Sequence, residues 1–134
     1  MPGDGAVFIS VCDRDKRAIA PVALSIANLG YDIVATAGTA KTLRACGIDA
    51  RVVRRVSEGH PNVVDLMAEG KVGFVINTPH GHASRGDGAR VRGEAASRGI
   101  CCVTALSATT ALVQSMAAAK GGASSTYALQ DIAV

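Results

Sequence analysis

The 134-residue chain is 49% hydrophobic and 19% charged, with a formal net charge of +3. This length fits one domain, and a hydrophobic fraction near one half excludes an intrinsically disordered chain. Aromatic side chains make up only 3% of the sequence and Trp is absent, which disfavours a protein that stacks single-stranded nucleic acid on aromatic rings.

Short apolar runs alternate with helical patterns along the chain. The predicted elements are, in order, strand 6–12, helix 15–29, strand 31–36, helix 39–45, strand 51–54, helix 61–69, strand 72–77, helix 89–98, strand 100–104 and helix 107–119. Asp15, Thr39 and Ser107 are predicted N-caps, and Pro61 suits the first position of its helix. Residues 121–125 are predicted to be a linker and 126–132 a short helical turn.

Five strands separated by helices predict an α/β fold, a three-layer, doubly wound sheet of five parallel strands with right-handed crossovers. We expect a single domain over residues 1–134, in which 121–134 form the linker and a short C-terminal helical tail. Hydroxyl and amide residues interrupt the uncharged run 101–119, so no membrane span is expected. The first residues lack the basic and apolar regions of a signal peptide, and a cytoplasmic location is therefore expected.

Polar residues follow the predicted strands, at the edge where such sheets bind ligands. We expect an anion site at Thr36–Thr39, because Gly38 permits close backbone approach and the amides that open the next helix point to the same space. Lys16 and Arg55 are predicted to converge on it. Thr is also a common helix cap and Gly a common turn residue, so an ordinary helix start fits the same pattern.

Other candidate residues favour ordinary structural roles. His60 is predicted to be exposed near a helix start, and Asp13 with Asp15 could form a carboxylate pair. His80 and His82 could supply two metal ligands, but solvated loop histidines are the favoured interpretation and no metal site is predicted. The 4 cysteines, Cys12, Cys46, Cys101 and Cys102, are interpreted as small buried thiols in a reducing compartment. No catalytic residue is predicted, since neither a credible Ser-His-Asp order nor a P-loop is present.

Several longer segments resemble the carboxyl-terminal regulatory domain of the large subunit of carbamoyl phosphate synthetase, which has the methylglyoxal-synthase-like fold. The resemblance covers nearly the whole chain. It is carried by residues 7–11, 15–16, 29–39, 43–48, 53–59, 61–62, 75–78, 87–92 and 127–131.

The resemblance implies a non-catalytic regulatory module of a glutamine-hydrolysing, ATP-dependent ligase of arginine and pyrimidine biosynthesis. In that family the domain binds nucleoside monophosphates, and in bacterial enzymes UMP inhibits and IMP activates. The implied phosphate contacts are Lys16, Thr36, Gly38, Thr39 and Arg55, the nucleoside contacts are Ser10, Asn77 and Thr78, and the position of an ornithine contact at the domain boundary is Thr104. Arg55 replaces the commoner Lys, and Pro79 stands where some members have a ligand-binding Thr, which leaves the effector open.

The resemblance also implies partners. They are the remaining domains of the large subunit, the glutaminase small subunit and a second copy of the domain, with no nucleic acid and no membrane. This domain is expected to need no cofactor, although the parent enzyme uses ATP and Mg or Mn.

The alternative is methylglyoxal synthase, which shares the fold and the phosphate site. It eliminates phosphate from dihydroxyacetone phosphate and needs a carboxylate base. Its Gly-Asp and Trp-Asp-Pro-Leu-like segments are replaced here by residues 58–61 and 77–80, and Glu58 is the only acid nearby. The amino-terminal domain of the bifunctional purine enzyme that closes IMP shares the fold, but its loops match no better. A non-enzymatic anion-binding domain is therefore the favoured interpretation.

Overall fold

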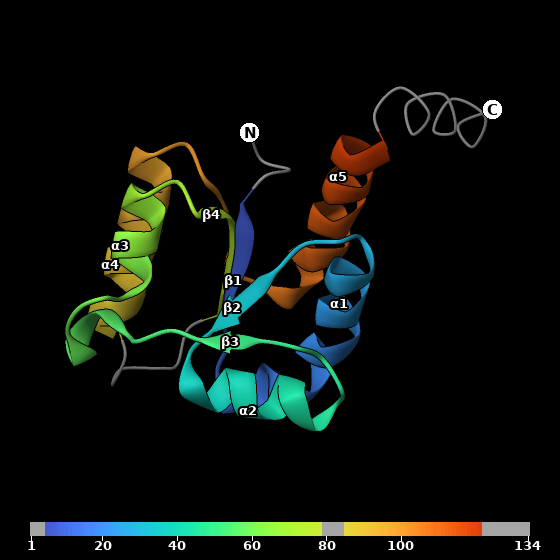
Figure 1. Ribbon diagram of the computed structural model, residues 1–134, viewed down its shortest axis with the longest axis horizontal. Helices are drawn as coiled ribbons and strands as arrows, with labels where there is room; N and C mark the ends of the chain where they lie inside the picture. The colour runs from blue at the N-terminus through green and yellow to red at the C-terminus, as the bar shows by residue number, and fades with distance from the viewer. Residues whose placement is uncertain (1–4, 79–84, 122–134) are drawn as a thin grey trace.

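The chain forms one parallel sheet of five strands (Figure 1). The computed structural model describes residues 5–78 and 85–121. The strands are β1 (Ala6–Ser10), β2 (Ile33–Ala35), β3 (Arg51–Val52), β4 (Val72–Asn77) and β5 (Cys101–Val103). Their order across the sheet is β3-β2-β1-β4-β5, and all four neighbouring pairs are parallel. The predicted doubly wound sheet is confirmed.

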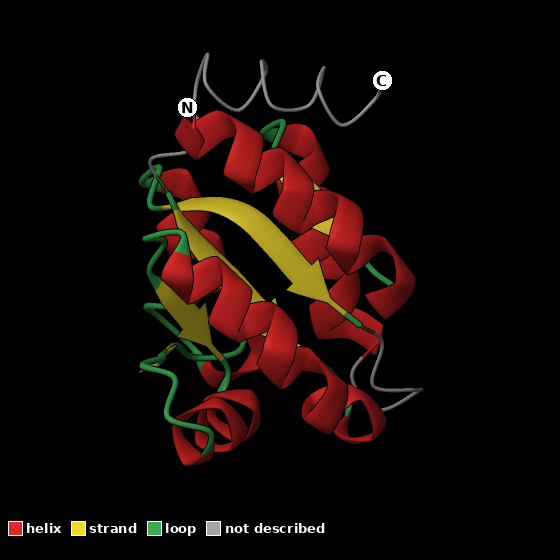
Figure 2. Ribbon diagram, turned by 90° about the vertical axis from the view of Figure 1, so that its right-hand side faces the viewer, coloured by secondary structure: helices red, strands yellow, loops and turns green. Residues whose placement is uncertain are grey.

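Helices cover both faces of this sheet and make the three predicted layers (Figures 1 and 2). One face packs against α1 (Lys16–Asn28), α2 (Ala37–Ala45) and α5 (Thr109–Gly121), and the other against α3 (Val63–Ala68) and α4 (Arg85–Ser97). Short 3₁₀ turns are η2 (Asp13–Asp15), η3 (Val56–Glu58) and η4 (Leu106–Ala108). Of the predicted linker and tail, Gly121 instead ends α5, and residues 122–134 lie outside the described residues.

Alternating side chains of the central strands enter two separate cores. Val7 and Ile9 of β1 pack into the cluster on the α1, α2 and α5 face, whereas Phe8 packs into the cluster on the α3 and α4 face. The same alternation in β4 buries Ile76 on the first face and Val75 on the second. Burial on both faces explains why these strands are continuous apolar runs in the sequence.

Three helix starts differ from the sequence predictions. Thr36, and not Thr39, occupies the N-cap of α2, and Thr39 lies inside the first turn. The N-cap of α3 is Asn62, whose side chain accepts hydrogen bonds from two amides of the first turn, so Pro61 precedes the helix. Ser107 lies within η4 and does not cap α5.

The boundaries of other elements also move. The pairing of the third strand is limited to Arg51–Val52, and beyond it Arg54 makes only an isolated bridge to Asn62. The helix predicted from residue 89 begins at Arg85.

The strand order changes direction between β1 and β4. The helices that follow these two strands, α1 and α4, lie on opposite faces of the sheet. The register pairs Ser10 with Asn77 at the carboxyl ends. Ligands of doubly wound sheets bind at such a switch point.

Gly5 marks a close approach of two backbones. A Cβ built at Gly5 would lie 2.4 Å from the backbone nitrogen of Gly73. Gly73 belongs to β4, which pairs with β1. Backbone atoms yield poorly, so Gly5→Ala is expected to lower the free energy of unfolding by about 1–3 kcal/mol, measured by urea denaturation.

Gly93→Ala is the matched control for Gly5→Ala. Gly93 is an exposed residue of α4, and an added Cβ there would have no neighbour within 4 Å. This substitution is expected to raise the free energy of unfolding by up to about 1 kcal/mol. Equal effects of the two substitutions would contradict the close approach.

Candidate functional site

Most of the buried polar side chains of the described residues gather at the carboxyl ends of β1, β2 and β4. We call this group, together with Lys16 and Gly38, the carboxyl-edge site. Its members are Ser10, Lys16, Thr36, Gly38, Thr39, Asn77 and Thr78. All of them were predicted from the sequence, and the fold brings them to the same edge of the sheet.

Ser10, the last residue of β1, connects the neighbouring strands. Its hydroxyl accepts a hydrogen bond from Thr36 Oγ1 at 3.3 Å. Its carbonyl oxygen accepts from the Thr78 amide at 3.1 Å and from Asn77 Nδ2 at 3.5 Å. These contacts tie the ends of β2 and β4 to β1 and fix the positions of the polar side chains there.

Two of the threonine hydroxyls hold the chain that leaves β1. Thr39 Oγ1 accepts from the Val11 amide at 3.3 Å, and Thr78 Oγ1 accepts from the Cys12 amide at 3.0 Å. Both threonines are almost fully buried. Their hydroxyls therefore shape the carboxyl-edge site, and their contact with a ligand stays a prediction.

The ammonium group of Lys16 lies at the start of α2. Lys16 Nζ and Cε are 3.5 Å from the place that a Cβ of Gly38 would occupy. Gly38 and Ala37 are exposed in the first turn of α2. The leading amides of a helix lack partners within it and carry partial positive charge, so a cation beside them makes a place suited to an anion.

Lys16 already has an anionic neighbour in Asp13. Lys16 Nζ donates to Asp13 Oδ1, and the Asp13 side chain is 97% exposed whereas that of Lys16 is 18% exposed. Because Asp13 is open to water, its carboxylate can be exchanged for another anion at little cost in packing.

Neither Arg55 nor Thr104 contacts this group among the residues that the structure describes. Arg55 follows β3, one edge strand of the sheet, and its guanidinium makes no hydrogen bond or ion pair with any residue that the structure describes. Thr104 follows β5 at the opposite edge and is exposed. No contact among the described residues joins either of them to Lys16.

Asp15 makes a contact that the sequence analysis missed. It occupies the N-cap of α1 as predicted, but its side chain makes no capping bond. Its Oδ2 accepts instead from the Cys12 thiol at 3.1 Å. This hydrogen bond, with further help from Thr78 and the charge of Arg14, lowers the pKa of Asp15 against an opposing effect of burial. Asp15 is therefore a fixed carboxylate next to Lys16 in the sequence.

Arg92 is a second residue that sequence reasoning missed. Arg92 Nη1 donates to Asn77 Oδ1 at 3.1 Å, which brings a cation from α4 to the end of β4. In the sequence, residues 87–92 carry part of the resemblance, but the Arg90–Arg92 pair does not show which arginine faces the sheet.

The cysteine prediction holds only in part. All four thiols are free, as expected. Cys46 and Cys101 are exposed, however, because Cys46 follows α2 and Cys101 lies on the edge strand β5. Their predicted burial is wrong, and Cys12 and Cys102 are only partly buried.

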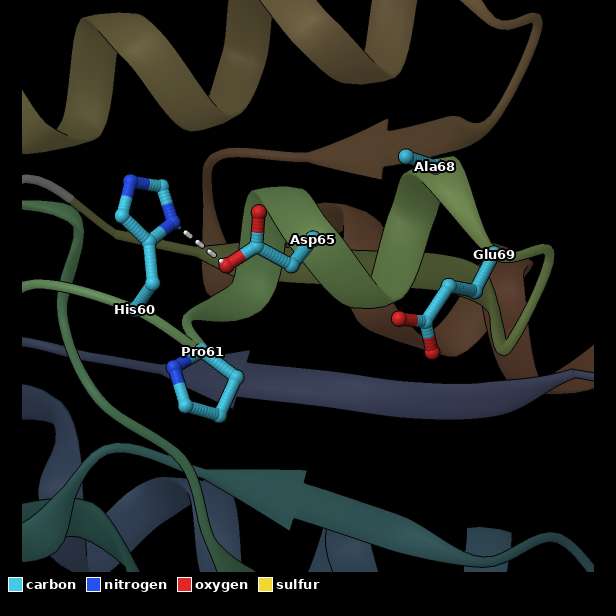
Figure 3. Close-up of a pocket in the computed structure, with 5 residues that line it drawn as sticks. All are labelled: His60, Pro61, Asp65, Ala68 and Glu69. Atoms are coloured by element: carbon cyan, nitrogen blue, oxygen red, sulfur yellow. Dashed lines mark hydrogen bonds and ion pairs between the residues drawn. The ribbon is translucent and has the colours of Figure 1, made fainter.

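A hollow lies along α3, and none of the residues that line it belongs to the carboxyl-edge site (Figure 3). Its volume is about 460 Å³, and it is lined by His60, Pro61, Asp65, Ala68 and Glu69. His60 Nδ1 lies 2.7 Å from Asp65 Oδ2, which also accepts the Asn62 amide at 2.8 Å. His60 is exposed, as predicted. This network fixes the start of α3.

His80 and His82 lie outside the described residues, so their predicted loop position is not addressed. Within residues 5–78 and 85–121, no cluster of three or more metal-ligating side chains is found. In the same ranges, no helix has the length and apolarity needed to span a bilayer.

The fold and the carboxyl-edge site define an α/β domain with a polar, cation-bearing edge at its switch point. The sequence profile of the MGS-like domain matches residues 18–104. The chain belongs to the MGS-like domain family.

Its relatives include large chains of carbamoyl phosphate synthase. The C-terminal section of the large chain from Methanopyrus kandleri is 42% identical over 133 residues, covering 98% of this chain and 24% of that protein. The large chain from Clavibacter michiganensis is 42% identical over 139 residues, covering 100% of this chain and 13% of that protein. The chain thus spans a quarter or less of these relatives, and the resemblance seen in the sequence is confirmed.

Solved structures support the same fold. A methylglyoxal synthase from Elizabethkingia anophelis superposes with a TM-score of 0.66 at 16% identity, covering 84% of this chain and 78% of that one. A protein named ForH superposes with a TM-score of 0.62 at 18% identity, covering 90% and 84%. At such identities the likeness concerns the fold alone.

Asp65 predicts a pH dependence of stability. The hydrogen bonds from His60 and then from the Asn62 amide lower its pKa from the ordinary value of 3.8. The ionised carboxylate therefore stabilises the folded chain above that pH, and the contribution disappears as the pH falls through the folded-state pKa. Asp65→Asn imitates the protonated acid, so it should destabilise the chain at neutral pH, and this effect should disappear once the pH falls below the lowered folded-state pKa.

Urea denaturation at several pH values measures this difference. Asp49→Asn is the control, because Asp49 is exposed and its carboxylate makes no contact with any residue described. A destabilisation by Asp65→Asn that stays constant into acid would contradict the assignment.

Proposed function

We propose that this chain is the effector-binding regulatory domain of a carbamoyl phosphate synthetase large subunit and binds a nucleoside monophosphate such as UMP or IMP. The observation that carries the proposal is the Lys16 ammonium beside Gly38 at the exposed start of α2. The relatives that carry the name of that large chain support the assignment.

The phosphate would bind at the start of α2. The amides of Ala37 and Gly38 would donate to its oxygens, and the helix macrodipole favours its negative charge. Lys16 would add a charge-assisted hydrogen bond of about 1.5–3 kcal/mol, taking the phosphate in place of Asp13. Arg55 would supply a second cation from the end of β3.

The nucleoside would extend along the carboxyl ends of β1 and β4. Ser10 and Asn77 are opposite each other in the sheet register, and Thr78 is the next residue. Their hydroxyl and amide groups suit the hydroxyls of a ribose and the polar edge of a base. Thr104, at the far edge, would meet the neighbouring domain and its ornithine.

Regulation would require the rest of the enzyme. A bound effector shifts activity only if it binds two conformational states of the complete enzyme with different affinities. A coupling free energy of about 1–3 kcal/mol changes the affinity about 5–150-fold. The other domains of the large subunit and the glutaminase small subunit would supply these states, together with the ATP and metal chemistry. The effector site itself would need no cofactor. The four free thiols fit the cytoplasmic location that we propose.

Methylglyoxal synthase activity needs a base with a pKa suited to removing a carbon-bound proton. The lowered pKa of Asp15 makes it a weak base. Glu58 Oε1 is held by the Arg55 amide at 2.6 Å, near the edge strand β3. These two observations favour binding over elimination.

Isothermal titration calorimetry with UMP and IMP tests the proposal. The chain is expected to bind at least one of them, with the same dissociation constant in the presence and absence of EDTA. Lys16→Met should weaken binding by about tenfold or more because it removes the cation beside the phosphate.

Lys41→Met, an exposed lysine of α2 that removes the same charge, is the control and should leave the affinity nearly unchanged. Indifference to both nucleotides, or release of phosphate from dihydroxyacetone phosphate, would refute the proposal.

Gly38→Ala separates stability from binding. The new methyl group would lie 3.5 Å from Lys16 Nζ, in the space proposed for the phosphate. We expect about tenfold weaker nucleotide binding. The same change removes a glycine from α2 and should stabilise the chain by up to about 1 kcal/mol. Thermal denaturation and calorimetry on one preparation measure both effects. An unchanged nucleotide affinity would contradict the proposed binding of the phosphate beside Gly38.

A further inference from the structure

Arg92 reaches from α4 to the carboxyl end of β4. It donates through Nη1 to Asn77 Oδ1 at 3.1 Å, and it is half-buried there. Asn77 itself is only 4% exposed. The contact links the helix that covers one face of the sheet to a residue of the carboxyl-edge site.

Gly88 keeps the path of the Arg92 side chain open. A Cβ built at Gly88 would lie 2.8 Å from Arg92 Nη1 and 3.4 Å from Asn77 Oδ1. Any larger residue one helical turn before Arg92 would therefore displace the guanidinium from the amide. The position of the Arg92 guanidinium therefore depends on the small size of Gly88.

The positive charge of Arg92 has no carboxylate partner among the residues whose side chains are described. Its hydrogen bond is to a neutral amide. Cys102 is close enough for the charge of Arg92 to lower the pKa of its thiol, although burial raises that pKa more strongly. Buried charges are ordinarily paired with an opposite charge. The half-buried guanidinium of Arg92 instead donates its described hydrogen bond to a neutral amide oxygen.

The contact decides which groups Asn77 offers to a ligand. Oδ1 is occupied by Arg92, and the amide nitrogen has a single partner among the described residues, the Ser10 carbonyl at 3.5 Å. An amide nitrogen carries two N–H groups, and with Oδ1 taken by Arg92 the group that Asn77 can offer to a ligand is an N–H donor. A donor at this position is complemented by a ligand that supplies an acceptor.

We propose that Arg92 is a positioning residue that fixes the Asn77 amide with its N–H groups toward the carboxyl-edge site. The ligand group that lies there must then be a hydrogen-bond acceptor, such as a hydroxyl or carbonyl oxygen. This proposal rests on the proposed function, in which the phosphate binds at α2 and the nucleoside lies beside Asn77.

The test compares two probes on two matched variants of the chain. UMP carries a nucleoside and inorganic phosphate does not, so only UMP can use Asn77. Arg92→Met removes the guanidinium, and Arg90→Met removes an identical charge from an exposed position of the same helix. Calorimetry measures UMP directly and inorganic phosphate by its competition with UMP.

Arg92→Met is expected to weaken UMP binding by about tenfold relative to Arg90→Met, while the two variants bind inorganic phosphate equally. Arg92→Lys, which keeps a donor, should recover part of the UMP affinity. In the Asn77→Ala background, Arg92→Met should cause no further loss, because the residue acts through Asn77.

Two results would overturn the proposal: equal UMP affinities of Arg92→Met and Arg90→Met, or a full further loss in the Asn77→Ala background. If Arg92→Met does not fold, the UMP affinities of Arg92→Lys and Arg92→Gln are measured instead. Affinities equal to that of the unchanged chain would then overturn the proposal. Failure of the unchanged chain to bind UMP, IMP or phosphate would instead remove the proposed function and this inference with it.

Discussion

The register between β1 and β4 is the constraint on which the site depends. It places Ser10 opposite Asn77 where the strand order reverses. Since both faces of the two strands are buried, a shift of one residue would move every core side chain to the wrong face. The hydrophobic core therefore fixes the positions of polar groups that contribute nothing to it. The hydrogen bonds around Ser10 then need only adjust side chains that packing has already brought together.

The positive groups at this edge of the sheet lie beside two carboxylates, which differ in how firmly they are held. Lys16 and the leading amides of α2 attract anions, while Asp13 and Asp15 lie in η2, the turn directly before Lys16. Asp15 is held by the Cys12 thiol, whereas Asp13 is almost fully exposed. One carboxylate is thus part of the framework and the other is a replaceable partner. The exposed carboxylate of Asp13 neutralises the charge of Lys16, whose own side chain is only 18% exposed.

The sequence predicted the parts of this structure that depend on local pattern. Apolar runs located the strands, glycines located the ends of helices, and the order of strands and helices placed the polar residues at one edge of the sheet. It failed where distant residues decide. Thr36 and Thr39 are equally good caps in isolation, but in the fold Thr36 is the N-cap and the Thr39 hydroxyl accepts from the Val11 amide, 28 positions away. The role of Arg92 depends on the rotation of α4, whose Gly-rich start has little amphipathic pattern. The convergence of Arg55 on Lys16 was inferred from chain order and stays a prediction, because chain order gives the edge of the sheet but not the reach of a side chain.

The outer strands of the sheet are very short. Two residues of β3 and three of β5 are paired, and both strands lie at the margins of the sheet. A short margin gives another polypeptide few unpaired backbone groups to bind, which protects against uncontrolled strand addition. Packing of this domain against neighbouring domains or a second copy is therefore expected to use helical surfaces and loops, where side chains and not backbone amides decide which partner fits.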